Sequence, residues 1–269
     1  MPPSMVEQVL QKLGMDAFPS VDRASLAAVY GAWCRRVPFD NIRKRIALSE
    51  ASAGPLPGDT PEDFFSAWVT HGTGGTCWSG NGALHGLLRS LGFDARRGIA
   101  TMLSRPDLEP NHGTVLVRLC DSLLLVDASM LHDEPLVLDE GAESRVEHDA
   151  WGVHCRRSGG RFVVRWHPLR VEEMDCRIEA LDAPPQAFAR GHELSRKRSG
   201  FNSQLTVRVI RGAAVVGVVR GDLVVRDPAG LQRTEALQGE ARHAFLVEEL
   251  GVSPEMAERV PADEPRPED

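Results

Sequence analysis

Long apolar runs and amino-terminal targeting features are missing from this sequence. No run of about 18 consecutive apolar residues occurs, although a transmembrane helix needs roughly that length. The first residues lack the basic and apolar regions of a signal peptide. Acidic residues (38) outnumber lysine and arginine (31), and the formal net charge is −7, which argues against a general nucleic-acid or anionic-membrane binder. We therefore expect a cytoplasmic protein with no nucleic-acid and no membrane partner.

Cysteine is scarce and irregularly placed, which argues against both a disulfide framework and a zinc site. The five cysteines are odd in number and widely spread, and none forms a C-x-x-C pair. The phosphate-binding patterns G-x-x-x-x-G-K-[ST] and G-x-G-x-x-G are absent as well. We expect no bound metal or cofactor, and one reactive thiol among packing thiols in a reducing compartment.

The composition that remains is typical of a globular protein, with 42% hydrophobic and 26% charged residues. Residues 5–70 predict mostly helix, and from about residue 94 the apolar period changes to two, which predicts strands. Residues 180–200 predict a linker with a basic cluster, residues 237–250 a helix, and residues 254–269 a frayed acidic tail. Strands are expected at 113–119, 123–127, 161–166, 205–210, 214–219 and 222–226.

Cys77 has the sequence context of a nucleophile. It lies in residues 72–81 (G-T-G-G-T-C-W-S-G-N), and apolar residues at helical spacing follow as far as the helix-ending Gly92. With Thr76 as the N-cap, Cys77 falls in the first helical turn, where the partial positive charge of the helix N-terminus favours a thiolate. On local sequence alone, a glycine-flanked cysteine that simply packs at a helix start is an equal alternative.

His112 and Asp127 flank the two strands of a predicted hairpin. If the turn near residues 120–122 has an even number of residues, the two side chains point to one face, opposite or diagonal to each other. A carboxylate after the apolar run 123–126 is costly to bury unless it is paired, and a histidine ring N–H is the obvious partner. The order Cys, His, Asp is that of a thiol nucleophile, its base and the residue that orients the base.

Five segments together resemble the arylamine N-acetyltransferase family, from about residue 5 to about residue 250, of which this chain would be a divergent member. Residues 37–42 (V-P-F-D-N-I) are similar to the family's (I/V)-P-F-E-N-L, and residues 74–81 to its G-G-x-C-F-E-x-N. Residues 111–117 resemble the segment around its histidine, residues 125–127 its V-D, and residues 199–201 its late S-x-F. The resemblance implies a catalytic triad of Cys77, His112 and Asp127.

The sequence also departs from the family pattern. Thr73 replaces the arginine before the two glycines, and Ser79 replaces the glutamate after the cysteine. The segment that lines the family's acceptor pocket, V-D-x-G-F-G, continues here after the aspartate as Ala128-Ser129-Met130. The resemblance and the local apolar context together predict substrate-binding residues at Phe39, Trp78, Met130, Ser199 and Phe201.

The resemblance implies an α+β fold with a core like that of cysteine proteases and transglutaminases. We expect a helical domain with the nucleophile (1–92), an antiparallel β-barrel-like domain with His112 and Asp127 (93–185), a small α/β lid (186–252) and a flexible acidic tail (253–269).

The activity implied is ping-pong transfer of an acetyl or acyl group from a CoA thioester to a small-molecule amine, with acetyl-CoA as co-substrate. Two other enzymes remain open: an amide synthase that takes its acyl chain from an acyl carrier protein, and a cysteine hydrolase or transglutaminase-like enzyme. A non-catalytic binding protein is the third alternative, because Thr73 and Ser79 depart from the motif.

Overall fold

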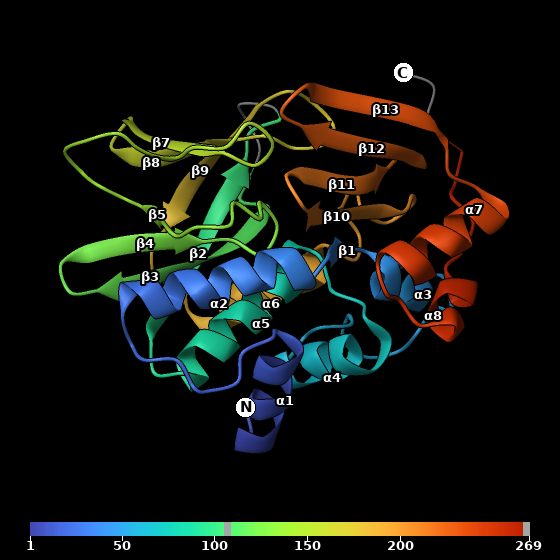
Figure 1. Cartoon of the computed structure of the whole chain (residues 1–269), viewed down its shortest axis with the longest axis horizontal. Coiled ribbons are helices and arrows are strands. Elements are labelled where there is room, and N and C mark those ends of the chain that lie inside the picture. Colours follow the sequence, from blue (N-terminus) through green and yellow to red (C-terminus); the bar gives the residue numbers. More distant parts are fainter. Residues whose placement is uncertain (105–108, 266–269) are drawn as a thin grey trace.

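The first third of the chain is helical, as Figure 1 shows for the computed structural model. The structure describes residues 1–104 and 109–265. Trp33, Phe64 and Phe65 stack or meet edge to face at the centre of the helical core, with ring centroids 5.4–5.9 Å apart. The helices of this part are α1 (Pro3–Lys12), α2 (Arg23–Arg36), α3 (Ile42–Ser49), α4 (Pro61–His71) and α5 (Cys77–Ser90).

Local capping sets the ends of these helices. Asp22 caps α2 by accepting a hydrogen bond from the Ser25 N–H, and Thr60 caps α4 in the same way. Gly72 ends α4 with φ +71°, and an added Cβ there would lie 2.1 Å from the carbonyl oxygen of Gly251. Only glycine satisfies both conditions, so α4 turns sharply into the loop that leads to α5.

An eight-stranded antiparallel sheet follows, and it curls into a nearly closed barrel because its edge strands β5 and β6 contact each other. The order in space is β5-β4-β3-β2-β9-β8-β7-β6. An apolar core fills its interior, with Leu116, Leu125 and Val164 fully buried. The strands are β2 (Asp94–Met102), β3 (His112–Leu119), β4 (Ser122–Val126), β5 (Leu136–Val137), β6 (Ser144–Val146), β7 (Val153–Ser158), β8 (Arg161–Trp166) and β9 (Met174–Ala180).

The β3–β4 hairpin has the geometry that the sequence predicts. Leu119 pairs with Ser122 across a two-residue turn, and Val115 pairs with Val126. The even loop puts His112 and Asp127 on one face, in a diagonal relation across the two strands.

A second antiparallel sheet joins the two ends of the chain. Its order is β1-β10-β11-β12-β13, and the short β1 (Phe39–Asp40) comes from the helical part. Ile42 and Ile46 of α3 share an apolar core with β10, η1 and α8. Figure 1 shows α3, α7 and α8 gathered beside this sheet. The remaining elements are β10 (Thr206–Arg211), β11 (Ala214–Val219), β12 (Asp222–Asp227), β13 (Gly230–Ala236), α7 (Gly239–Ala244), the π-helical turn η1 (Phe245–Glu249) and α8 (Pro254–Arg259).

Two predicted irregular segments are ordered elements. The expected linker at 180–200 contains α6 (Pro185–Leu194), which begins at a proline and buries Phe188. The expected frayed and flexible tail from residue 253 is wrong as far as residue 265. Met256 of α8 is buried in the carboxyl-terminal core, and Asp263 forms an ion pair of 2.6 Å with Arg45. Residues 266–269 lie outside the described residues.

The predicted α+β fold, with leading helices and a barrel-like antiparallel sheet, is confirmed. The domain boundaries at 92/93 and 185/186 remain predictions, and β1 and α3 pack with the carboxyl-terminal sheet. None of the helices in the described ranges combines the length and apolarity that a membrane span requires.

Candidate active site

Cys77 is the first residue of α5 and is nearly buried, with 7% of its surface exposed. Thr76 stands at the N-cap position, as predicted, although its side chain makes no capping hydrogen bond. The Cys77 thiol lies 4.0 Å from the carbonyl oxygen of Asn111, the residue before His112. The start of β3 and the start of α5 therefore meet at the thiol.

His112 and Asp127 form a buried pair beside Cys77. The His112 Nε2 lies 2.7 Å from the Asp127 Oδ2, and both side chains are at most 2% exposed. The Cys77 side chain is close enough to the His112 ring to contribute to raising the pKa of His112. Since Nε2 faces the carboxylate, Nδ1 is the ring atom left to exchange a proton with the thiol.

The surroundings of His112 and Asp127 favour a protonated imidazole and an ionised carboxylate. Burial opposes a charge on His112, but the charge of Asp127 and hydrogen bonds to Asp127 and Cys77 outweigh it and raise the pKa of His112. Burial likewise opposes a charged Asp127, but the charge of His112 and its hydrogen bond hold the pKa of Asp127 well below its usual range. The imidazolium form of His112 is therefore favoured at neutral pH, next to a thiol that can give up its proton.

Several hydrogen bonds position the Asp127 carboxylate. Its Oδ1 accepts hydrogen bonds from the backbone N–H groups of Ser129 (2.8 Å) and Met130 (3.0 Å). The Asn81 amide lies 3.4 Å from the same oxygen, and it binds the Gly113 carbonyl (2.6 Å) and the Ala128 N–H (2.9 Å). Asn81 thus ties α5 to both strands of the hairpin.

Tyr30 of α2 fixes the backbone of Asp127. Its hydroxyl donates to the Asp127 carbonyl (2.9 Å) and accepts from the Asp127 N–H (3.1 Å) and the His132 N–H (3.3 Å). Sequence analysis did not single out Tyr30. The one available signal was that this fully buried residue is the only tyrosine in the chain.

The loop before Cys77 is anchored by Asp40 of β1. The Asp40 carboxylate accepts hydrogen bonds from the N–H groups of Gly74 (2.6 Å) and Ile42 (3.0 Å). Its burial raises the pKa of Asp40 to about 6, while those hydrogen bonds act in the opposite direction. An added Cβ on Gly74 would lie 1.8 Å from the Pro38 carbonyl oxygen. The two family-like segments 37–42 and 74–81 are therefore packed against each other.

The helix α6 covers the start of α5. Phe188 meets the ring of Trp78 edge to face at 5.0 Å, and Gly191 lies so close to Trp78 that an added Cβ would be 2.4 Å from its ring. The segment expected to be a linker thus forms one wall of the site.

The predicted substrate-binding residues lie in different surroundings. Phe39 and Phe201 pack edge to face at 5.3 Å, and Trp78 lies directly after Cys77. Met130 is fully buried in the barrel core. Ser199 is half-buried and accepts a hydrogen bond from the Phe201 N–H. Their part in substrate binding stays a prediction.

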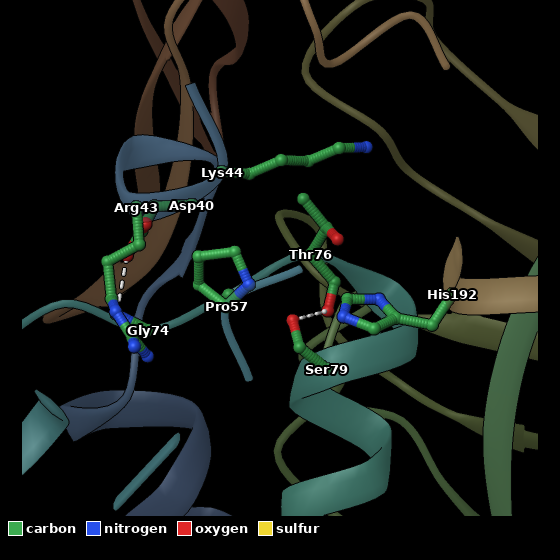
Figure 2. Close-up of a pocket in the computed structure, with 9 residues that line it drawn as sticks. Asp40, Arg43, Lys44, Pro57, Gly74, Thr76, Ser79 and His192 are labelled. Carbon is green, nitrogen blue, oxygen red and sulfur yellow. Dashed lines mark hydrogen bonds between the residues drawn. The ribbon is translucent and has the colours of Figure 1, made fainter. Parts of the chain in front are cut away.

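A polar pocket opens beside the Gly74–Thr76 loop, as Figure 2 shows. Lys44 of α3 and His192 of α6 reach into it from two sides of Thr76. Neither residue could be singled out from the sequence, because only the fold brings α3 and α6 together. The pocket is lined by Asp40, Arg43, Lys44, Pro57, Gly74, Gly75, Thr76, Ser79 and His192.

Comparison with known proteins places the chain in a family. A profile of the N-acetyltransferase family matches residues 22–166, more than half of the chain. An arylamine N-acetyltransferase of Mycolicibacterium smegmatis is 27% identical over 174 residues, which cover 60% of this chain and 61% of that protein. The match thus spans less than two thirds of the relative's length. The chain belongs to the arylamine N-acetyltransferase family, as its motifs indicate.

Solved structures agree on the fold along nearly the whole chain. The M. smegmatis arylamine N-acetyltransferase structure gives a TM-score of 0.79 at 20% identity, covering 95% of this chain and 97% of that one. The Mycobacterium marinum structure in complex with CoA gives 0.79 at 17% identity, covering 95% and 98%. At these identities, the likeness shows the fold alone.

Proposed function

We propose that this protein is an acyltransferase that moves an acetyl or other acyl group from a CoA thioester to a small-molecule amine through Cys77. The observation that carries the proposal is the contact network of Cys77, His112 and Asp127 at the start of α5. Family membership supports acyl transfer, and the M. marinum protein with CoA bound supports CoA as the donor.

The geometry supports a ping-pong reaction in two half-reactions. In the first, the Cys77 thiolate attacks the thioester carbonyl carbon, and the CoA thiolate leaves with the proton that the His112 imidazolium gives up. In the second, the amine attacks the acyl-cysteine carbonyl, His112 takes a proton from the amine, and Cys77 leaves as thiolate. Asp127 fixes the tautomer of His112 and stabilises its positive charge throughout.

Backbone N–H groups at the start of α5 are the donors proposed for the oxyanion that forms in each half-reaction. The first N–H groups of a helix have no partner within the helix, and they carry its positive end. Cys77 and Trp78 stand at this end. Fixed N–H donors at such a position stabilise a tetrahedral intermediate without reorganisation.

The test is the intact mass of the protein after mixing with acetyl-CoA in the absence of an amine. We expect a gain of about 42 Da, the mass of one acetyl group on the nucleophile of covalent catalysis, and its loss when an amine is added. Cys77→Ser should remove the gain and lower turnover on the order of a thousandfold, with an unchanged circular dichroism spectrum. Turnover by Cys77→Ser above a few per cent of wild type would contradict the covalent mechanism.

The alternative enzymes give different masses. A hydrolase returns to its starting mass and releases free acetate without any amine, whereas an amide synthase is acylated by a carrier-protein thioester and not by acetyl-CoA. A binding protein shows no change of mass with either donor.

A further inference from the structure

Lys44 is a buried cation without a carboxylate partner. Its ammonium group donates to the Ser195 carbonyl (2.9 Å) and the Ser195 hydroxyl (3.0 Å), and only 5% of the residue is exposed. Among the side chains that the structure describes, no carboxylate lies within ion-pair distance of Lys44, and its third N–H has no acceptor. Burial of a charge without a counter-charge is costly, so such a group is expected to meet an anion during function.

The neighbouring charged groups are already paired. Arg43 binds Asp63 through two hydrogen bonds of 2.8 and 3.0 Å, and Arg196 forms an ion pair with Glu193. The Asp40 carboxylate receives two backbone N–H groups. Lys44 is therefore the cation of this pocket that is available for a ligand.

A ring nitrogen of His192 in the same pocket also lacks a hydrogen-bond partner among the described residues. His192 is 5% exposed, its Nε2 lies 3.4 Å from the Leu56 carbonyl, and its buried Nδ1 has no partner among the described residues. Figure 2 shows the His192 ring beside Thr76 and Ser79, inside the pocket. Two buried polar groups from different elements thus face the same small space.

The pocket adjoins the nucleophile. Thr76 lines it and directly precedes Cys77, the first residue of α5. An acyl group attached to Cys77 would therefore lie next to the pocket that contains Lys44. Burial lowers the pKa of Lys44 to about 8, and an anion beside its ammonium group would act in the opposite direction.

We propose that Lys44, together with His192, selects acyl groups that carry a carboxylate at their far end, so that CoA monothioesters of dicarboxylic acids are preferred donors. The carboxylate supplies the negative charge that buried Lys44 lacks and accepts its third N–H. The inference rests on the proposed acyl-enzyme at Cys77. The chemistry of the acyl transfer itself is unchanged, because the distal carboxylate is not a reacting group.

The experiment compares succinyl-CoA with butyryl-CoA, two donors with four-carbon acyl groups that differ in the terminal carboxylate. We expect the kcat/KM ratio to favour succinyl-CoA by roughly tenfold or more, as one charge-assisted hydrogen bond gives. Lys44→Met should bring the ratio to about one or below, and Lys44→Arg should keep part of the preference. Any general effect of Lys44 on the Cys77 thiolate cancels in this ratio.

Lys197→Met is the matched control, since it removes an exposed lysine just after α6. Both donors carry the same CoA phosphates, so any contact of Lys197 with them cancels and the ratio should stay at the wild-type value. A wild-type ratio of one or less overturns the proposal without any variant. If the wild-type protein nevertheless turns over butyryl-CoA, the proposed acyltransferase function still stands.

A third comparison tests whether Lys44 recognises a carboxylate on the acyl group or on the amine acceptor. With butyryl-CoA as donor, 4-aminobenzoate and 4-methylaniline are compared as acceptors in wild type and Lys44→Met. We expect no Lys44-dependent preference between these amines. A preference for the carboxylated amine that disappears in Lys44→Met would overturn the assignment of the pocket to the acyl group.

Discussion

At the residue scale, Tyr30 holds the backbone of Asp127, the residue proposed to orient His112. Its hydroxyl binds the Asp127 carbonyl, the Asp127 N–H and the His132 N–H. In Tyr30→Phe the Asp127 and His132 N–H groups lose this partner, while the Asp127 carbonyl keeps the Leu131 N–H. We expect a cost of about 1–3 kcal/mol in the free energy of unfolding. Because Asp127 then shifts relative to His112, we expect kcat to fall while KM changes little. Urea unfolding and steady-state kinetics measure both effects. Lost stability with unchanged kcat would show that the hydroxyl is only structural.

The two most informative cysteines differ in exposure and in electrostatic surroundings. Cys77 is nearly buried beside protonated His112, whereas Cys120 is exposed in the hairpin turn. We expect iodoacetamide at about pH 7 to modify Cys77 first, because reactivity follows the thiolate. Mass mapping after limited reaction gives the order of labelling, and Cys120→Ser should leave the rate at Cys77 unchanged. Equal or faster labelling of Cys120 would mean that exposure decides the reactivity.

A functional side chain can be predicted from the sequence when its position depends on residues that are close to it in the chain. Cys77 follows from its position at a helix start, and the His112–Asp127 pair from strand parity and a two-residue turn. Lys44 and His192 were not predictable, because 148 positions separate them and only the fold puts both beside Thr76.

At the scale of elements, the packing of α6 on α5 leaves little room at Gly191. An added Cβ there would lie 2.4 Å from the Trp78 ring, whereas at Gly82 the nearest atom, on Phe188, is 3.6 Å away. We expect Gly191→Ala to push α6 away from Trp78, lowering stability by about 1–3 kcal/mol and reducing kcat/KM. Gly82→Ala is the matched control on the same interface and should change neither quantity. Thermal unfolding measures the stability of both variants, and steady-state kinetics measures their kcat/KM. Equal values for the two variants would contradict tight packing of α6 on Trp78.

The elements that sequence analysis missed have a common physical cause. Both α6 and α8 begin at a proline in a region rich in charge, and both become helical by burying a few apolar side chains against distant partners. Phe188 packs on Trp78, and Met256 packs in a core shared with α3. Proline at the first helical position was the available local signal for both. By contrast, α5 and the β3–β4 hairpin have long apolar patterns of their own.

At the scale of the whole molecule, the His112–Asp127 pair couples stability to pH. The pKa of His112 is raised above its ordinary value of 6.5, so the folded protein binds this proton more tightly than the unfolded chain. The stabilisation is complete below that value and is lost as the pH rises from 6.5 toward the folded pKa, by at most about 1.4 kcal/mol per pH unit. We expect the free energy of unfolding to fall less steeply with pH in Asp127→Asn than in wild type.

Urea titrations at several pH values between about 6 and 9 provide this comparison. Asp121→Asn, the same change at an exposed position in the hairpin turn, should keep the wild-type slope. Identical slopes in wild type and Asp127→Asn would show that His112 gains no proton affinity from its partner. Only the slopes are compared, so a general loss of stability in Asp127→Asn does not affect the conclusion.

The strand β1 pairs with β10, and its Asp40 holds the loop before Cys77. Asn41 adds hydrogen bonds to the carbonyl groups of Phe201 and Gln204. During synthesis the ribosome makes Cys77 well before β10, because chains grow from the amino terminus. The loop that presents the thiol therefore gains its support only when the last third of the chain has emerged. An unfinished chain therefore carries Cys77 without this support, so on the proposed mechanism the thiol reaches its reactive geometry only after synthesis of β10.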